Sequence, residues 1–232
     1  MKFIEQPDSY SDILVRIFTS SLMTGVACTI VLCIVSPDIK QFIESIPGQS
    51  DIGPFKGLAT SYVLIPFIIS LFSRAIKLHD KISNILRIRQ KFDVEHILFN
   101  IVRGVGMDIN GTLKAFLKLK HQEVMYKVFY EYAGFNEPKI DRQLVRSALD
   151  SWGWFWAALE SSMILLITLV ILFVYKKWYL FTIGIIFMIS LVCLLFFHWF
   201  ECRTYALREV KAILSDDTRK REIKKYLTTL AT

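Results

Sequence analysis

Apolar residues in this chain are gathered in four long blocks, which cover about residues 13–35, 55–74, 152–175 and 178–199. A helix that crosses a bilayer needs about 20 apolar residues, and in hydrocarbon only a helix or a closed barrel satisfies its own backbone polar groups. The blocks lack the alternating pattern of barrel strands. We therefore predict an all-α membrane protein with four transmembrane helices.

The four predicted spans divide the chain into four parts. Residues 1–76 form an N-terminal transmembrane hairpin, and residues 151–199 form a second, tight hairpin. Residues 77–150 between them show the helical period in their apolar positions and predict a helical insert. Residues 200–232 predict a basic helical tail that continues from the fourth span.

Four helices are predicted within the insert. In the first, Leu78, Ile82, Ile85 and Leu86 share one face. Residues typical of helix ends give the other boundaries. Asp93 is expected to cap the second helix. Thr112 is expected to start a long third helix that ends at Tyr132, and Pro138 to start a helix that enters the third span. In the tail, Asp216 to Thr218 are expected to cap a last helix.

Charge gives the predicted orientation. Counted as Lys and Arg minus Asp and Glu, residues 77–150 carry +4, residues 199–232 carry +3 and residues 36–57 carry −1. Loops rich in Lys and Arg stay on the cytoplasmic side. We therefore expect a protein of the cell inner membrane, with both termini, the insert and the tail in the cytoplasm.

Two ionisable residues lie inside predicted spans. Arg16 falls about one helical turn into the first span and Glu160 about two turns into the third. An ionisable group costs roughly 2.5–3.5 kcal/mol in a span and normally faces protein or water. One hypothesis is a structural pair of Arg16 with Glu160; the other places Glu160 in a cytoplasmic vestibule of an oligomer. A proton relay is disfavoured, because no second acid or histidine is expected at the same depth.

Small residues and one proline shape the first two spans. Ser21, Gly25 and Thr29 recur every four residues, so they form one packing face of the first span. This face is assigned either to contacts within one protomer or to a seam between identical copies. Pro66 is expected to kink the second span, with the freed carbonyl bonded by Ser61 or Thr60.

The tail carries a cluster of basic residues, which are Arg219, Lys220, Arg221, Lys224 and Lys225. Attraction to anionic lipid headgroups explains such a cluster, at about 1 kcal/mol per charge near the membrane surface. A nucleotide or nucleic acid would use the same charges. The tail lacks the interleaved aromatic residues that stack on bases, so the lipid interpretation is favoured.

Sequence motifs for catalysis, metals or cofactors are absent, so neither a catalytic site nor a cofactor is predicted. Arg89 and His96 are separated by six residues, a spacing that resembles the R-x4–6-H pattern of HEPN ribonucleases. That resemblance would place both side chains at an RNA-facing dimer seam. Asp93 as a helix cap between them would spoil this geometry.

The plan of four spans with a helical cytosolic insert and no enzyme signature resembles small membrane subunits of bacterial anti-phage systems, such as the membrane component of Kiwa. It is also similar to four-span effectors that respond to nucleotide signals. The resemblance implies a membrane subunit that oligomerises and whose cytoplasmic domain holds a partner or senses a signal. It rests on the plan of the chain and not on a motif.

We therefore expect a homo-oligomeric membrane protein whose cytoplasmic helices bind a soluble protein partner or ligand. Its role would be that of a sensor, a scaffold or a regulated pore in anti-phage defence. The alternatives are a small secondary transporter or channel unrelated to defence, and a membrane-tethered HEPN-like ribonuclease.

Overall fold

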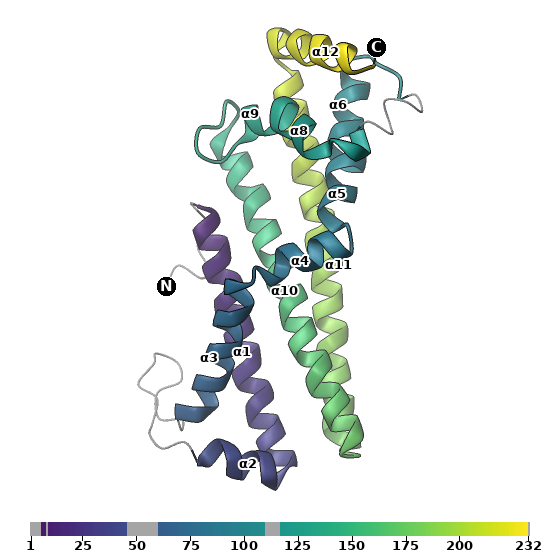
Figure 1. Cartoon of the computed structure of the whole chain (residues 1–232). Coiled ribbons are helices and arrows are strands. Elements are labelled where there is room, and N and C mark those ends of the chain that lie inside the picture. Colours follow the sequence, from purple (N-terminus) through teal and green to yellow (C-terminus); the bar gives the residue numbers. More distant parts are fainter. Residues whose placement is uncertain (1–5, 8, 46–59, 110–116, 232) are drawn as a thin grey trace. The chain divides into compact units, whose positions relative to one another are not determined.

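The computed structural model describes residues 6–7, 9–45, 60–109 and 117–231, and every regular element in these ranges is helical (Figure 1). The chain forms two compact units. Unit 1 consists mainly of residues Tyr10–His79 and Gly153–His198, and unit 2 of Asp80–Trp152 and Trp199–Thr232. Two long helices, α10 (Arg142–Val174) and α11 (Trp178–Leu214), contribute residues to both units.

Three helices in the described ranges are long and apolar enough to cross a membrane, and these are α1 (Tyr10–Val35), α10 and α11. Two shorter helices, α3 (Thr60–Ala75) and α4 (Leu78–Ile85), meet the same criterion only as a pair. They are bent by 57° relative to each other. The expected all-α membrane class is therefore supported by three helices, with the bent pair as the candidate for a fourth.

In unit 1, α1 and α10 lie side by side and run in the same direction. Arg16 contacts Trp154, and Ser20 further along α1 contacts Ser161 further along α10. The contacts advance together along both helices, which establishes the parallel direction. This agrees with the expectation that the first and third spans begin on the same side.

Helix α1 ends at a local stop signal and a short helix follows. Ser36 is the N-cap of α2 (Pro37–Glu44), and its hydroxyl accepts a hydrogen bond from the Ile39 N–H at 3.4 Å. Pro37 at the first helical position lacks the N–H that would be unsatisfied there. The sequence analysis predicted no helix in this stretch.

Helices α1 and α3 approach closely at Gly25. A Cβ atom added there would lie 2.9 Å from the Pro66 Cβ atom, so only glycine fits. Helix α3 runs through Pro66 as one helix, and the change of direction comes later, at Ile76 and Lys77. The expected role of Ser61 is wrong, because its buried hydroxyl has no hydrogen-bond partner.

The hairpin between α10 and α11 is as tight as the sequence predicted, with only residues 175–177 between the helices. Lys176 takes a left-handed conformation with φ 54°, and the Lys177 N–H donates to the Leu172 carbonyl at 3.0 Å. This arrangement satisfies carbonyls at the end of α10. A Cβ atom at Gly184 of α11 would lie 2.6 Å from Leu169 Cδ2 of α10.

In unit 2, three consecutive helical segments form one continuous stretch over residues 88–104. They are α5 (Ile88–Phe92), the π-helix η2 (Asp93–Leu98) and α6 (Phe99–Gly104). The prediction that Asp93 caps a new helix is wrong, because Phe92 and Asp93 both keep right-handed helical angles and the helix continues through them. Arg87, with φ 52°, begins the stretch.

The second half of the insert is broken more often than predicted. After Lys120 come α8 (His121–Met125), the π-helix η3 (Tyr126–Tyr130) and α9 (Glu131–Ala133). Lys120, with φ −112° and ψ 28°, interrupts the expected long helix, and its proposed cap Thr112 lies outside the described residues.

Helix α10 also begins later than predicted, at Arg142 and not at Pro138. Asp141 precedes this start, and its carboxylate accepts a hydrogen bond from the Gln143 N–H at 2.9 Å. An aspartate at this position satisfies one of the free N–H groups of the first turn, which explains why the helix starts here. The helix then continues without a break into the third apolar block, as expected.

The first predicted helix of the insert does not bury the face that its period suggested. Ile82 is buried, but Ile85 is 79% exposed and Leu86 is 62% exposed. Helix α4 ends at Ile85 and the chain turns at residues 86–87, so the period that joined these residues is interrupted. The expected common face is therefore wrong.

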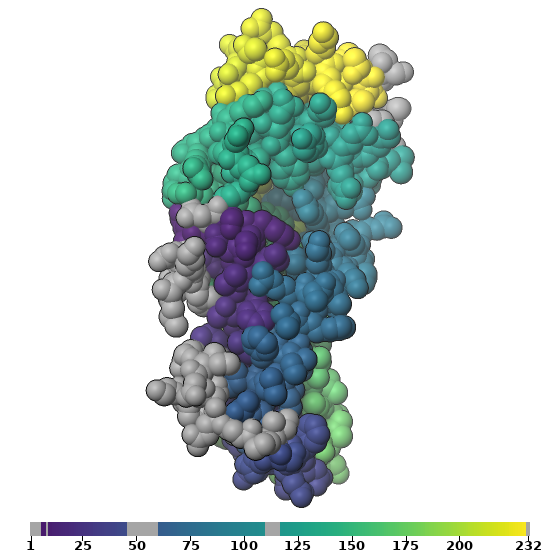
Figure 2. All heavy atoms as spheres, turned by 60° about the vertical axis from the view of Figure 1, so that its left-hand side comes forward, coloured from purple at the N-terminus to yellow at the C-terminus, as the bar shows by residue number. Residues whose placement is uncertain are grey.

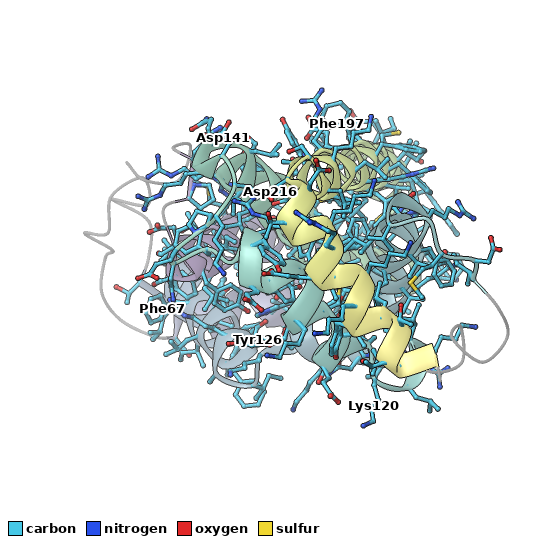
Figure 3. All side chains as sticks on the ribbon, turned by 90° about the horizontal axis from the view of Figure 1, so that it is seen from above. Phe67, Lys120, Tyr126, Asp141, Phe197 and Asp216 are labelled. Carbon is cyan, nitrogen blue, oxygen red and sulfur yellow. The ribbon has the colours of Figure 1, made fainter. Side chains whose placement is uncertain are left out.

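The core of unit 2 joins the insert to the tail. Val102 and Met125 of the insert pack in one buried cluster with Ile213 of α11 and Leu227 of α12 (Asp217–Ala231). Figure 3 shows α12 crossing this unit from Asp216 towards the side on which Lys120 lies. The insert therefore completes its hydrophobic core with residues from the tail.

Candidate functional site

Glu160 is the centre of a buried polar site in unit 1. The residue is 5% exposed, and its Oε2 atom accepts hydrogen bonds from Ser21 Oγ of α1 at 3.0 Å and Ser73 Oγ of α3 at 3.2 Å. A buried carboxylate is costly unless such donors surround it. Donors from α1 and α3 thus hold one acidic side chain of α10.

A histidine faces the other oxygen of the same carboxylate. His79 is 5% exposed, and its Nδ1 atom lies 3.9 Å from Glu160 Oε1. Its second ring nitrogen, Nε2, lies 3.0 Å from the hydroxyl of Tyr10 at the start of α1. We call Tyr10, Ser21, Ser73, His79 and Glu160 the Glu160 cluster.

The cluster overturns the expectation that no histidine lies at the depth of Glu160. His79 lies five residues after the second apolar block, and the sequence analysis assigned it no role. The bend between α3 and α4 brings it beside α10. In a four-span chain the end of the second span and the start of the third share one face, and this topology was the signal that could have identified His79.

A pocket of about 380 Å³ borders the cluster at Tyr10 and His79. It lies between the start of α1 and the end of α3, which are neighbours in Figure 2. Its lining is otherwise formed by Leu14, Leu71, Arg74, Ala75 and Lys77. Pockets of about 300–1,000 Å³ are large enough for a small ligand.

Arg16 is buried beside an aromatic ring of α10. It is 2% exposed, and its guanidinium carbon lies 4.7 Å from the centre of the Trp154 ring. A Cβ atom at Gly153 would lie 3.2 Å from Arg16 Nη1, so this glycine leaves room for the guanidinium. The predicted pairing of Arg16 with Glu160 stays a prediction.

The predicted packing face of α1 makes two kinds of contact within the chain. Ser21 bonds Glu160 and Gly25 packs on Pro66, whereas the Thr29 hydroxyl donates to the Gly25 carbonyl of its own helix at 2.9 Å. A second seam was missed, in which Ser161 of α10 bonds the hydroxyls of Ser20 and Thr24 at 3.0 and 3.1 Å. The seam between identical copies stays a prediction.

Unit 2 buries another carboxylate, that of Asp93. Burial raises the pKa of Asp93 to about 7, against the opposing charge of Arg89, whose Nε atom lies 3.8 Å from Oδ2. Arg89 also donates a hydrogen bond to the Tyr130 hydroxyl at 3.2 Å, and burial raises the pKa of Tyr130. We call Arg89, Asp93 and Tyr130 the Asp93 cluster.

The structure does not bring Arg89 and His96 together at one polar site. Arg89 bonds Tyr130, whereas the His96 ring packs against Phe92 and Trp199 with ring centres 5.2 and 6.1 Å apart. Burial, together with the charge of Arg203, lowers the pKa of His96. Within one chain, the two residues of the HEPN-like spacing therefore serve different contacts.

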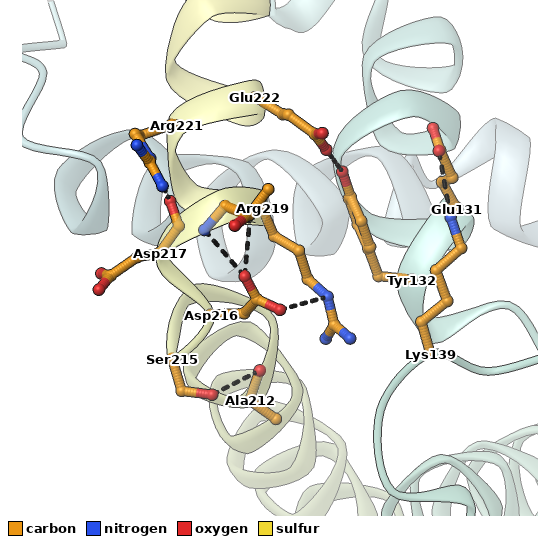
Figure 4. Close-up of polar contacts among 11 residues, drawn as sticks. Glu131, Tyr132, Lys139, Ala212, Ser215, Asp216, Asp217, Arg219, Arg221 and Glu222 are labelled. Atoms are coloured by element: carbon orange, nitrogen blue, oxygen red, sulfur yellow. Dashed lines mark hydrogen bonds and ion pairs between the residues drawn. The ribbon is translucent and has the colours of Figure 1, made fainter.

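The basic cluster of the tail divides into anchored and exposed residues. Arg219 pairs with Asp216 at 3.4 Å and lies over the Tyr132 ring, as Figure 4 shows. The Asp216 carboxylate also accepts hydrogen bonds from the N–H groups of Thr218 and Arg219, which lower its pKa and confirm it as the cap of α12. Exposed members of the cluster are Lys220, Arg221, Lys224 and Lys225.

Metal ligands do not gather in the described part of the chain. Within residues 6–7, 9–45, 60–109 and 117–231, no group of three His, Cys, Asp or Glu side chains is arranged to hold a metal ion. Separately, the Glu160 cluster offers binding and transfer of a proton, because a histidine and a carboxylate face each other beside a pocket.

Comparison with known proteins identifies the family. The model of the YmfE protein family matches residues 9–229. The protein YmfE of Escherichia coli (strain K12) is 25% identical over 179 residues, which are 75% of this chain and 73% of that protein. No solved structure matches the chain. The match over nearly the whole length shows that this chain belongs to the YmfE protein family.

Proposed function

We propose that this chain is a four-span protein of the cell inner membrane and that it acts as a proton-responsive sensor or scaffold. In this proposal α1, α3, α10 and α11 cross the bilayer, and α4, which follows the bend at Ile76 and Lys77, leads from the end of α3 into the cytoplasmic unit 2. The excess of Lys and Arg in residues 77–150 and 199–232 favours the cytoplasm for unit 2 and for both termini.

The orientation is testable by cysteine labelling in intact cells. In a chain whose four native cysteines are replaced, Lys40→Cys in α2 should react with an impermeant maleimide, and Lys120→Cys in unit 2 should react only after lysis. Both lysines are exposed, so accessibility of the side chain does not favour either site. Labelling of Lys120→Cys in intact cells would reverse the proposed orientation.

The buried pair of His79 and Glu160 is the observation that carries the sensing function. An imidazolium at His79 would donate from Nδ1 towards Glu160 and from Nε2 to the Tyr10 oxygen, whereas a neutral imidazole has one N–H and can donate to only one of them. The bordering pocket gives His79 a route for exchange of the proton with water.

Unit 2 supplies the proposed output, which is binding of a soluble partner. Its surface exposes large apolar side chains at Ile85, Leu86, Leu119 and Tyr126. The Gln90 side chain bonds the Lys118 carbonyl at 2.9 Å and so joins the segments that carry Leu86 and Leu119. Figure 3 places Tyr126 and Lys120 on the same side. Exposed apolar side chains of this size favour a protein partner.

Self-association is a further part of the proposal. Only 6% of the most apolar 18-residue window of α11 is buried within the chain. Its surface therefore faces lipid or a second copy, and the mass of the purified complex in detergent distinguishes these two. A role in anti-phage defence is proposed from the four-span plan alone, and phage challenge of a strain that lacks the gene tests it.

The central experiment measures hydrogen exchange of unit 2 in nanodiscs at pH 5.5 and pH 7.5. In the wild type, we expect the hydrogen-exchange rate of residues 88–104 to change between the two pH values by more than the intrinsic exchange rate changes. His79→Asn and Glu160→Gln should remove the part of this change that unit 1 contributes. Because Asp93 titrates in unit 2, the Asp93→Asn variant serves as the matched control. An unchanged difference in both unit 1 variants would contradict the sensor.

A second candidate function is a proton-coupled transporter or channel, and the same pair favours it. Purified protein in liposomes with a trapped pH dye would then carry a proton flux that Glu160→Gln abolishes. Absence of proton flux in the wild type, together with pH-dependent hydrogen exchange in unit 2, would exclude the transporter and favour the sensor. The ribonuclease alternative receives no comparable support, since Arg89 and His96 are held apart in separate contacts.

A further inference from the structure

We propose that the pocket at the end of α3 binds one anionic phospholipid. Its phosphate would lie at Arg74 and Lys77, and the first part of an acyl chain along Leu14 and Leu71. These four residues belong to the lining of the same pocket of about 380 Å³. The surface of the pocket is mostly apolar, so the methylenes would fill it and the phosphate would lie towards the exposed side chains of Arg74 and Lys77.

The charges of the pocket favour an anion. Arg74 and Lys77 are exposed, and among the described carboxylates none pairs with either side chain. A guanidinium binds two oxygens of a phosphate at once, and a lysine adds a further point charge. Basic pockets between membrane helices at the cytoplasmic surface are a known type of binding site for lipid headgroups.

The backbone holds the two basic residues at one place. Lys77 has a left-handed conformation with φ 50°, and its N–H donates to the Arg74 carbonyl at 3.1 Å. A lysine pays a steric penalty in this region, which glycine would avoid. The turn ends α3 and sets both residues on the lining of the same pocket.

The surroundings favour a lipid over a free phosphate ion. Leu71 of the lining is 49% exposed, and its neighbours on α3 are more exposed, with Ile68 at 55%, Ile69 at 56% and Phe72 at 64%. In the proposed membrane this surface faces acyl chains, so one chain of a bound lipid can continue along it. Tyr10, at the rim, is of the residue type that favours the headgroup level.

Contact with His79 connects the lipid site to the Glu160 cluster. An anionic headgroup beside the imidazole would favour its protonated form. Only this coupling rests on the proposed sensing function. Binding of the lipid itself depends on the pocket and its two basic residues, and it can be measured separately.

The test is native mass spectrometry of the full-length protein in a neutral detergent, with phosphatidylglycerol or phosphatidylcholine added at equal concentration. We expect one phosphatidylglycerol to bind about tenfold more tightly than phosphatidylcholine. Arg74→Gln with Lys77→Gln should lower its affinity to that of phosphatidylcholine. Ala75→Trp keeps both charges but fills the pocket, and should also abolish the preference.

Lys176→Gln with Lys177→Gln is the matched control, because it removes two exposed basic residues of the same unit from outside the pocket. It should keep the preference. Equal binding of the two lipids, an unchanged preference in both pocket variants, or displacement of the lipid by millimolar inorganic phosphate would each overturn the lipid site. Circular dichroism of every variant confirms that it has folded.

Discussion

Unit 1 buries the carboxylate of Glu160 and unit 2 buries those of Asp93 and Glu209, and Glu160 and Asp93 are held in different ways. In unit 1, two serine hydroxyls and a histidine face Glu160, and all three come from other helices. In unit 2, Asp93 faces Arg89 from the same helical stretch, at 3.8 Å. The first carboxylate therefore depends on tertiary structure for its partners, whereas the second is only partly compensated and keeps its proton near neutral pH.

The difference separates two uses of a buried acid. A carboxylate with donors on one oxygen and a histidine on the other has a defined place for a charge and for a proton. A carboxylate whose pKa is raised mainly by burial makes the stability of the surrounding structure depend on pH, and it needs no second titrating group to do so. Four predictions, each with its own control substitution, test this contrast and the packing of the two units.

The largest expected effect is that of Glu160→Met. The substitution removes the acceptor of two serine hydroxyls and the partner of His79, so we expect a loss of about 4 kcal/mol in the free energy of unfolding of unit 1. Glu160→Gln keeps an acceptor oxygen and should cost about 1 kcal/mol. Denaturant unfolding in micelles measures both. Equal losses would show that the donors do not need this acceptor.

The next effect is the pH dependence that Asp93 gives to unit 2. Because its folded pKa of about 7 exceeds the ordinary aspartate pKa of 3.8, the folded state holds a proton that the unfolded chain has released. Stability is therefore full below pH 4 and falls as the pH rises through 7. We expect about 3 kcal/mol of loss between pH 5 and pH 8.

Hydrogen exchange of residues 88–104, corrected for the intrinsic rate, measures this loss. Asp93→Asn should reduce the dependence, and the remaining slope should come from Glu209, whose pKa burial raises to about 8. Asp216→Asn should preserve the full dependence, because Asp216 already has a lowered pKa and is ionised throughout this range. An unchanged slope in Asp93→Asn would assign the effect to another group.

Helix packing in unit 1 gives a smaller effect. Gly25→Ala places a Cβ atom 2.9 Å from the rigid ring of Pro66, and we expect a loss of about 2 kcal/mol. Gly184→Ala meets Leu169 Cδ2 at 2.6 Å, the end of a flexible side chain that can rotate, so it should cost less. Thermal unfolding of the two variants side by side tests the ranking, and the reverse order would refute it.

The smallest effect concerns the cap of α12. Asp216→Ala removes the acceptor of two N–H groups and the partner of Arg219, with an expected loss of about 1 kcal/mol. Asp217→Ala, at the first position of the helix, is the control and should cost less. Limited proteolysis of the tail reports the opening of α12. Equal protection of both variants against the protease would contradict the cap.

The extent of the membrane helices was predictable because apolar length alone determines it. The third block predicted a helix that starts in the insert and ends at about residue 175, and α10 runs from Arg142 to Val174. The cap of α12 was also placed within residues 216–218 from residue type and position alone. Such features depend on residues close together in the sequence, and the physical rules for them are local.

The Glu160 cluster was not predictable in the same way. It requires the bend of 57° after Ala75, and that bend includes a lysine in a conformation that no sequence pattern demands. The exposed faces of Ile85 and Leu86 were missed for a related reason, because a periodic pattern does not reveal that the helix ends within it. At a break between helices, the residue types are compatible with more than one backbone conformation, so the sequence did not predict where the helix ends.

The two π-helices have a consequence for insertions and deletions. A π-helical turn contains one residue more than an α-helical turn, and η2 and η3 contribute Asp93 and Tyr130 of the Asp93 cluster. Deleting one codon within residues 94–98 would rewind the helix to α and rotate the preceding turns by about 100°. Arg89 would then face away from Tyr130, so relatives with a gap here should also have lost the arginine–tyrosine pair.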